Sequence, residues 1–211
     1  DDTISIAVSL GAKVFKRSLN NDFSQQRNFG LSKSKGRWVL FIDADERVTS
    51  QLCAEILEVI HSYKNDYIGF YIKRRDFIWH KEIKYGETGK AKFIRLARKG
   101  YGKWTRFVHE GWDLKGRVST MSNYITHFPH AQIREFVSNI NYYSSLQANS
   151  NTKDNKRSSL VKIIFWPKLK FITNYFLRVG FLDDTHGFVI AVLMSFHSFL
   201  SWSKQWMTQK E

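Results

Sequence analysis

The stretch Lys35–Thr49, with the sequence KGRWVLFIDADERVT, decides the fold of this chain. Its apolar run Trp38–Ile42 has no polar break and contains β-branched and aromatic residues, which is typical of a strand covered on both faces in a parallel sheet. Asp43 and Asp45 follow directly. Side chains two positions apart in an extended segment point the same way. Both carboxylates are therefore predicted to face one crevice at the carboxyl end of the strand, where open α/β sheets bind ligands.

An acidic pair at a strand end suits a hard divalent cation. Carboxylate oxygens are the ligands that Mg²⁺ and Mn²⁺ prefer. An ion held by them can bridge to a diphosphate and neutralise the charge that grows as the diphosphate departs. The same pattern also occurs in solvated acidic turns and at the start of a following helix, and the residues alone leave these interpretations open.

The segments around this stretch alternate between helix and strand. Asp22 is predicted to cap the helix that follows it. Helices are predicted at 22–35, 49–63 and 131–147, strands at 12–15, 67–72, 93–96 and 123–126, and either a strand or a short helix at 3–10. This order predicts an open α/β sheet.

The composition is strongly basic and rich in aromatic residues. Among 211 residues, 33 Lys and Arg against 19 Asp and Glu give a net charge of +14, and 16% are aromatic. Such an excess favours nucleic acid, an anionic membrane surface or phosphorylated small molecules as partners. The most basic segment, residues 73–106, is predicted either to steer anionic substrates, to rest on anionic lipid or to form a solvated face. A single cysteine excludes an internal disulfide.

The C-terminal region has a different composition. Residues 161–211 are rich in Phe, Ile, Leu and Trp, with lysines interleaved. The nearly apolar run 188–202 is shorter than the roughly 20 residues of a membrane-spanning helix, so a helix lying at the membrane interface fits better. Core helices or a dimer interface are the alternatives. We expect an α/β domain at 1–148, a linker at 149–160 and a helical, membrane-associating tail at 161–211.

Several motifs resemble those of family-two glycosyltransferases with the GT-A fold. QRNFGL (Gln26–Leu31), the KGRWVLFIDADERVT stretch and RFVHEGW (Arg106–Trp112) occur in that order, and RVGFL (Arg178–Leu182) follows in the tail. Within that group the chain is similar to bacterial enzymes that build lipopolysaccharide cores. The resemblance implies a GT-A-like, Rossmann-like α/β fold, in which an open sheet has helices on both faces and a helical tail follows.

The resemblance also implies a metal site. Asp45 would be the principal ligand of Mg²⁺ or Mn²⁺. Asp43 would contact the ribose of the donor, or the metal through water. His127, which ends an Ile-Thr-His segment, would be a third metal ligand.

Three further residues receive roles from the resemblance. Arg27 would lie near the donor, and Glu110 would be the general base that takes a proton from the acceptor hydroxyl, as inversion requires a carboxylate opposite the leaving group. Asp1 and Thr3 match the end of a donor-binding loop of the family, so Asp1 is expected to bind substrate. The first two strands of the family fold are expected to be missing from this chain.

The predicted function is metal-dependent, inverting transfer of a sugar from a nucleotide donor to a glycolipid or surface-glycan acceptor. The expected location is the cytoplasmic face of the bacterial inner membrane, with no nucleic-acid partner. Two alternatives remain. A catalytically inactive scaffold of the same fold would bind lipid without turnover, and a basic nucleic-acid-binding module would bind oligonucleotides in a salt-dependent manner that ignores Asp45.

Overall fold

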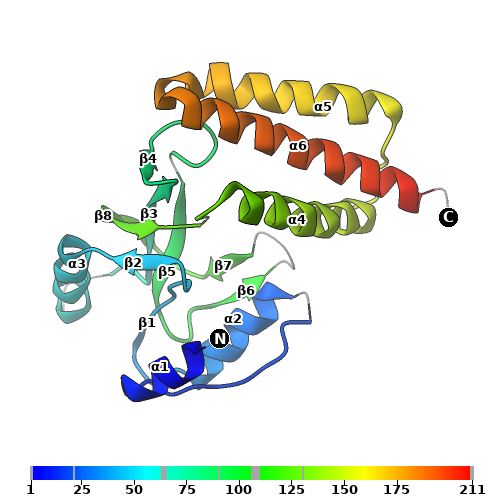
Figure 1. The fold of residues 1–211 in the computed structure, drawn as a ribbon. Helices are drawn as coiled ribbons and strands as arrows, with labels where there is room; N and C mark the ends of the chain where they lie inside the picture. Colours follow the sequence, from blue (N-terminus) through cyan, green and yellow to red (C-terminus); the bar gives the residue numbers. More distant parts are fainter. Residues whose placement is uncertain are drawn as a thin grey trace.

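A computed structural model describes residues 2–20, 22–62, 66–89, 91–105, 110–129 and 131–209. A curled sheet forms its centre, with α3 packed on one of its faces and the helices of the C-terminal half stacked beside it (Figure 1). The sheet consists of β1 (Trp38–Leu40), β2 (Glu46–Val48), β3 (Gly69–Ile78), β4 (Lys81–Ile83), β5 (Lys92–Arg98) and β8 (Val118–His127). Its order is β1-β5-β3-β8-β2, with β4 paired to β3. Strands β6 (Gly102–Thr105) and β7 (Gly111–Leu114) form a separate hairpin.

Helices α2 and α3 begin where the sequence supplies side-chain caps. The helical elements are α1 (Thr3–Ser9), α2 (Phe23–Lys33), α3 (Ser50–His61), α4 (Ile133–Lys153), α5 (Leu160–Ile172), the π-helical turn η1 (Thr173–Leu177), the 3₁₀ turn η2 (Gly180–Asp183) and α6 (Asp184–Thr208). The Asp22 side chain accepts the backbone N–H of Gln25, and Thr49 caps α3 in the same way. Each cap satisfies a backbone donor that the first helical turn leaves unpaired.

The core beside α3 follows from the apolar spacing of that helix. Leu52 and Ile56 are one turn apart and pack against Phe70 and Ile72 of β3. Leu52 and Ile72 are fully buried. Helix α3 therefore forms as predicted, whereas the strand predicted at 67–72 begins at Gly69 and continues to Ile78. The two elements fix the face of the sheet that lies opposite the site described below.

The strand β1 is partly as predicted. Trp38 packs on the core cluster of α3, whereas Val39 packs on a second cluster with Trp104 and Trp112, so side chains cover both faces. Its pairing with β5 is antiparallel, however, and β3 with β8 is the only parallel pair among the described strands. The prediction of a parallel sheet around this strand is wrong, because an uninterrupted apolar run reports coverage and not strand direction.

Other boundaries also differ from the sequence expectations. Residues 12–15 form no strand, and residues 3–9 are helical. Helix α4 continues to Lys153, so only residues 154–159 separate it from α5. The helical segment Gly180–Thr208 has 29 residues and a mean hydropathy of 1.2, which makes it long and apolar enough to cross a membrane by length and composition. The apolar run 188–202 thus lies within a longer helical segment.

Two glycines allow the tail to fold back on itself. A Cβ atom on Gly187 would lie 1.8 Å from the carbonyl oxygen of Gly180, and one on Gly180 would lie 2.5 Å from the carbonyl oxygen of Asn174. Only residues without a side chain permit these approaches. The turn between α5 and α6 is therefore held by backbone contact, and α6 packs on both α4 and α5.

Candidate active site

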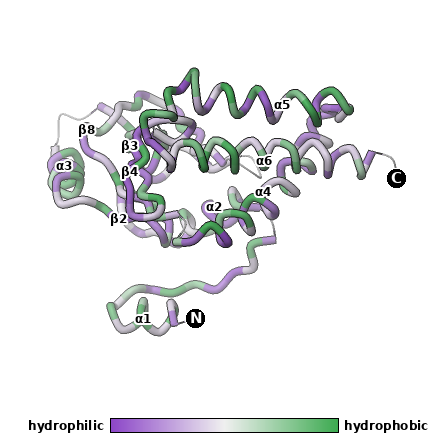
Figure 2. Tube along the Cα trace, turned by 45° about the horizontal axis from the view of Figure 1, so that its top comes forward, coloured by the Kyte–Doolittle hydropathy of each residue, from purple (hydrophilic) through white to green (hydrophobic). Residues whose placement is uncertain are grey.

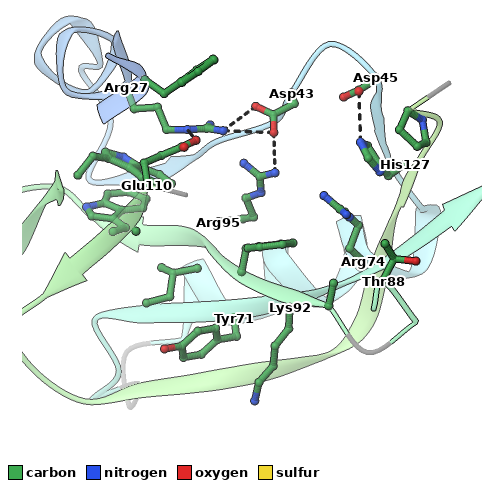
Figure 3. Close-up of a pocket in the computed structure, with 18 of the residues that line it drawn as sticks. Arg27, Asp43, Asp45, Tyr71, Arg74, Thr88, Lys92, Arg95, Glu110 and His127 are labelled. Carbon is green, nitrogen blue, oxygen red and sulfur yellow. Dashed lines mark hydrogen bonds and ion pairs between the residues drawn. The ribbon is translucent and has the colours of Figure 1, made fainter. Parts of the chain in front are cut away.

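A cavity of about 830 Å³ opens on the side of the sheet away from α3. Residues from α2, α4, the loop after β1 and the strands β3, β5, β6, β7 and β8 contribute to it (Figure 3). Its lining includes Arg27, Asp43, Asp45, Tyr71, Arg74, Glu87, Thr88, Lys92, Arg95, Trp104, Glu110, Trp112, His127 and Tyr143. Segments far apart in the sequence thus bring charged side chains of both signs to one hollow.

Arg27 joins two of the candidate carboxylates. It projects from α2, and its Nε donates to Oε1 of Glu110 at 2.8 Å. Its Nη2 donates to both oxygens of Asp43, at 2.9 and 3.2 Å. The neighbouring Asn28 fixes this helix, because its amide exchanges two 2.9 Å hydrogen bonds with the backbone of Trp104. The Arg27 side chain therefore holds Asp43 and Glu110 in a defined relative position.

Asp43 also belongs to a buried ion network beneath the cavity. Arg95 Nη2 lies 2.6 Å from Asp43 Oδ2 and 2.6 Å from Glu46 Oε1. The Glu46 side chain is fully buried and accepts the backbone N–H of Asp43 at 2.9 Å. A buried charge of this kind is tolerated only when it is paired and hydrogen-bonded. The loop that carries the acidic pair is therefore fixed from below.

Asp45 takes part in a second chain of contacts. Its Oδ2 lies 3.2 Å from His127 Nε2, and His127 Nδ1 lies 2.8 Å from Oδ1 of the buried Asp76. Arg74 completes the chain with its Nε 2.7 Å from the same Asp76 oxygen. The register of the sheet explains this meeting, because β8 pairs His127 with Glu46 of β2 on one side and with Asp76 of β3 on the other.

The two chains of contacts set the protonation of the site. Burial alone would raise the pKa of Asp43, but the guanidinium groups of Arg95 and Arg27 lower it overall. The hydrogen bond from His127 lowers the pKa of Asp45. Burial alone would lower the pKa of His127, yet its bonds to Asp45 and Asp76 raise it to about 9. Both aspartates are therefore charged at neutral pH, as an anionic metal- or ribose-binding pair must be.

An aromatic wall closes the cavity beside Arg27. Trp104 and Trp112 stack with their ring centroids 5.3 Å apart, and Phe41 meets both edge-on. The Arg27 guanidinium lies 4.7 Å from the Trp104 ring centroid. Low-polarity walls strengthen the interactions of the charges they enclose. The arrangement places preorganised charges beside an aromatic wall.

The structure places five of the six predicted site residues in this one cavity. Arg27, Asp43 and Glu110 meet directly, and Asp45 meets His127. Asp1 lies outside the described residues, as do positions 106–109 of the RFVHEGW motif.

The acidic pair is arranged differently from the expectation. Residues 44 and 45 form a turn, in which the Glu46 N–H donates to the Asp43 carbonyl, rather than an extended segment. The two carboxylates therefore turn to different partners, as Figure 3 shows. No group of three or more His, Cys, Asp and Glu side chains able to hold a metal ion occurs in the part of the chain that the structure describes.

Several residues of the site escaped the sequence analysis. Arg95 bonds Asp43 and Asp76 bonds His127, and Tyr143 of α4 also lines the cavity. The sequence pattern could have identified two of them, Arg95 and Asp76. Arg95 interrupts the apolar segment Phe93–Ala97, and Asp76 is the one acidic residue directly after three basic ones. A charge inside an apolar strand is rarely buried without a partner, so both positions pointed to an ion pair.

Comparison with known proteins identifies relatives along most of the chain. Residues 1–112 match the family model described as glycosyl transferase family 2. An uncharacterized glycosyltransferase of Rickettsia typhi is 29% identical over 224 residues, covering 97% of this chain and 73% of the relative. The lipopolysaccharide core biosynthesis glycosyltransferase LpsC of Rhizobium meliloti is 29% identical over 189 residues, covering 86% and 68%. A Rickettsia conorii glycosyltransferase is 28% identical over 221 residues, covering 97% and 76%.

Proposed function

The chain belongs to glycosyl transferase family 2, and on that premise we propose that its cavity transfers a sugar, with inversion, from a nucleotide-sugar donor to a glycolipid or surface-glycan acceptor of the lipopolysaccharide-core type. The chain is a glycosyltransferase by its family and relatives. One observation carries the finer assignment. Glu110 and Asp43 are held together by Arg27, and the Asp45–His127 pair lines the same cavity.

Glu110 suits the role of general base. Its side chain is mostly buried, and among the described residues Arg27 bonds only its Oε1. The other oxygen, Oε2, is available to accept a proton from an acceptor hydroxyl. Such a base raises the nucleophilicity of the hydroxyl as it attacks the anomeric carbon. Arg27 keeps the carboxylate oriented during this transfer, because its guanidinium is clamped by Asp43 from the other side.

The residues present fit a divalent cation in part. The Asp45 carboxylate and His127 Nε2 face each other, and Asp76 orients the ring through Nδ1, which is the usual second contact of metal-binding histidines. Mg²⁺ and Mn²⁺ commonly take one or two protein ligands and complete their coordination with substrate phosphates. Asp45 and His127 would hold the ion, for which the protonated His127 must first release its Nε2 proton, and Asp43 would contact the ribose. When bound, the ion supplies positive charge that stabilises the departing diphosphate.

A turnover assay tests this proposal. Wild-type protein is incubated with nucleotide sugars and Mn²⁺ or Mg²⁺, and released nucleoside diphosphate is measured with and without a chelator. We expect metal-dependent release that falls at least a hundredfold in Asp45→Asn. Asp66→Asn makes the same chemical change at a highly exposed position outside the cavity and serves as the control. Nucleoside diphosphate release that is unchanged both by the chelator and by Asp45→Asn would refute the metal assignment.

A further inference from the structure

The turn that joins α5 to α6 exposes a cluster of apolar side chains. We call Phe176, Leu177, Val179, Phe181 and Leu182 the apolar apex. Leu177 is 75% exposed and Phe176 is 54% exposed. The backbone of the turn is nevertheless ordered by its own hydrogen bonds, such as Arg178 N–H to the Thr173 carbonyl at 2.8 Å. The apex is therefore a preformed apolar surface and not a frayed chain end.

The exposed surface continues along both helices. Apart from Lys162, Lys168 and Lys170, every residue of α5 is apolar, and none of them is buried. On α6 the exposed residues recur every three or four positions, which is one face of a helix. These are Phe188, Val192, Phe196 and Phe199. Figure 2 shows hydrophobic segments recurring along α5 and α6. An apolar surface this extensive is unusual on a monomer and marks an interaction site.

Uncompensated positive charge borders the apex. The acidic side chains nearby are already paired: Glu87 bonds Lys170 at 2.7 Å, and Asp184 bonds Lys81 at 2.7 Å. Lys84 and Lys168 are exposed and form no ion pair with the described residues. With a net charge of +14 for the chain, a second copy would bring like charges together. An anionic surface would satisfy both the lysines and the apolar side chains.

Helix α6 carries a polar face that argues against a lipid-surrounded span. Gln205 is fully buried and lies 3.5 Å from Asn151 of α4. The Lys204 ammonium of α6 donates to the side chains of Asn141, Ser144 and Ser145 of α4, at 2.8 Å in each case. Polar groups in hydrocarbon need partners, and α4 supplies them only while α6 stays packed on the domain. The helix therefore suits a position on the membrane surface.

We propose that the apolar apex and the adjoining exposed faces of α5 and α6 dock the protein on an anionic lipid bilayer as a peripheral membrane protein. For a glycosyltransferase acting on a lipid-linked acceptor, this surface would be the cytoplasmic face of the inner membrane. The docking stands on exposed apolar side chains and unpaired lysines, and does not depend on the chemistry proposed for the cavity.

The apex is also linked to the cavity. Gly86 donates its N–H to the Arg178 carbonyl at 3.0 Å, and buried Asp183 accepts the N–H groups of Lys84 and Tyr85. The same loop then supplies Glu87 and Thr88 to the cavity wall. A bilayer under the apex would therefore lie next to this wall of the cavity.

Vesicle flotation of the full chain tests the docking. Vesicles of phosphatidylglycerol and phosphatidylethanolamine are compared with pure phosphatidylcholine at low and high salt. Wild-type protein should float with the anionic vesicles, less so at high salt. Leu177→Asp should lower the partition coefficient roughly tenfold or more, because it puts a charge at the most exposed position of the apex. Leu57→Asp, at a 47% exposed position on α3, is the matched control and should float like wild type.

Three outcomes would overturn the proposal. If wild-type protein stays unbound at low salt, the chain has no membrane-docking surface. If Leu177→Asp floats as well as wild type, the apolar apex is not part of that surface. Concentration-dependent dimers that Leu177→Asp dissociates, measured by analytical ultracentrifugation, would assign the face to a second copy. Circular dichroism confirms that each variant is folded. Nucleotide-sugar turnover is measured separately without vesicles, so failure of the docking and failure of the proposed chemistry are distinguishable.

Discussion

The cavity and the C-terminal tail place their side chains in opposite ways. Around the cavity, charged groups are buried, among them Glu46, Asp76 and Arg95. Along α5 and the turn after it, apolar groups face solvent, and α5 buries none of its side chains. Buried charge costs stability unless every partner is present, and exposed apolar surface contributes little to it. Both regions therefore depart from what folding alone favours, and each of these departures indicates a functional surface.

The difference makes opposite predictions for substitutions. Around the cavity, removal of one charged partner should destabilise the fold strongly, since it leaves another charge buried alone. On the tail, replacement of an exposed apolar side chain should leave stability intact and change only what the surface binds. The following predictions test this contrast.

The largest stability effect is expected for Arg95→Met. The change leaves the buried Glu46 without its cation, which costs about 3–5 kcal/mol when a buried pair is broken. Arg75→Met is the matched control, because Arg75 pairs with Glu82 at an exposed position and such pairs contribute at most about 1 kcal/mol. Urea unfolding of both variants measures the difference. Equal destabilisation of the two variants would mean that the buried ion network stabilises the fold no more than an exposed ion pair does.

A smaller loss is expected for Gly187→Ala. The new Cβ would collide with the carbonyl oxygen of Gly180, and backbone overpacking of this kind costs about 1–3 kcal/mol. Gly30→Ala in α2 is the control, since its Cβ meets only the Phe41 ring at an ordinary 3.6 Å. That variant should be neutral or gain about 0.5–1 kcal/mol from helix propensity. A melting temperature for Gly187→Ala that matches wild type would show that the tail tolerates a wider turn.

The contact between the cavity loop and the tail should depend on pH. Burial alone would raise the pKa of Glu87, but its bond to Lys170 lowers it overall from the ordinary 4.5. A lowered pKa stabilises the folded state above about pH 4.5, and the contribution is lost as the pH falls through the folded-state pKa. Wild type should therefore exceed Glu87→Gln in stability at pH 7, and the gap should narrow below pH 4.5. A gap that stays constant in urea unfolding from pH 3 to 7 would exclude a charge effect.

The smallest effect on stability is expected at the apolar apex. Leu177→Asp should change the free energy of unfolding by no more than about 0.5 kcal/mol, because the side chain is exposed and packs on little. Urea unfolding without lipid measures this value. A loss of 2 kcal/mol or more would show that the apolar apex stabilises the fold, as the buried charges around the cavity do.

The sequence predicted those parts of the fold and site that depend on local pattern. The spacing of Leu52 and Ile56 identified α3, and the acidic pair after an apolar strand identified one edge of the cavity. The meeting of Asp45 with His127 came from family resemblance, since 82 residues separate them.

What the sequence did not predict depends on pairing over long distances. Asp76 reaches His127 only through the register of β3 against β8, and Arg95 reaches Glu46 only because the loop after β1 folds over β5. Non-local strand pairing leaves no periodic signal in a single sequence. The turn at Asp43–Asp45 was missed for another reason, because Glu46 captures the Asp43 N–H and ends the extended run early.

The central claim is that the cavity performs glycosyl transfer with Glu110 as its base. The most direct measurement is the transfer rate of Glu110→Gln from a nucleotide sugar to a lipopolysaccharide-core acceptor, with donor affinity measured in parallel. Glu58→Gln, an exposed carboxylate on α3, provides the matched control. The account predicts a kcat for Glu110→Gln that is about 10²–10⁴-fold below wild type with donor affinity largely retained. A kcat equal to that of wild type and Glu58→Gln would contradict it.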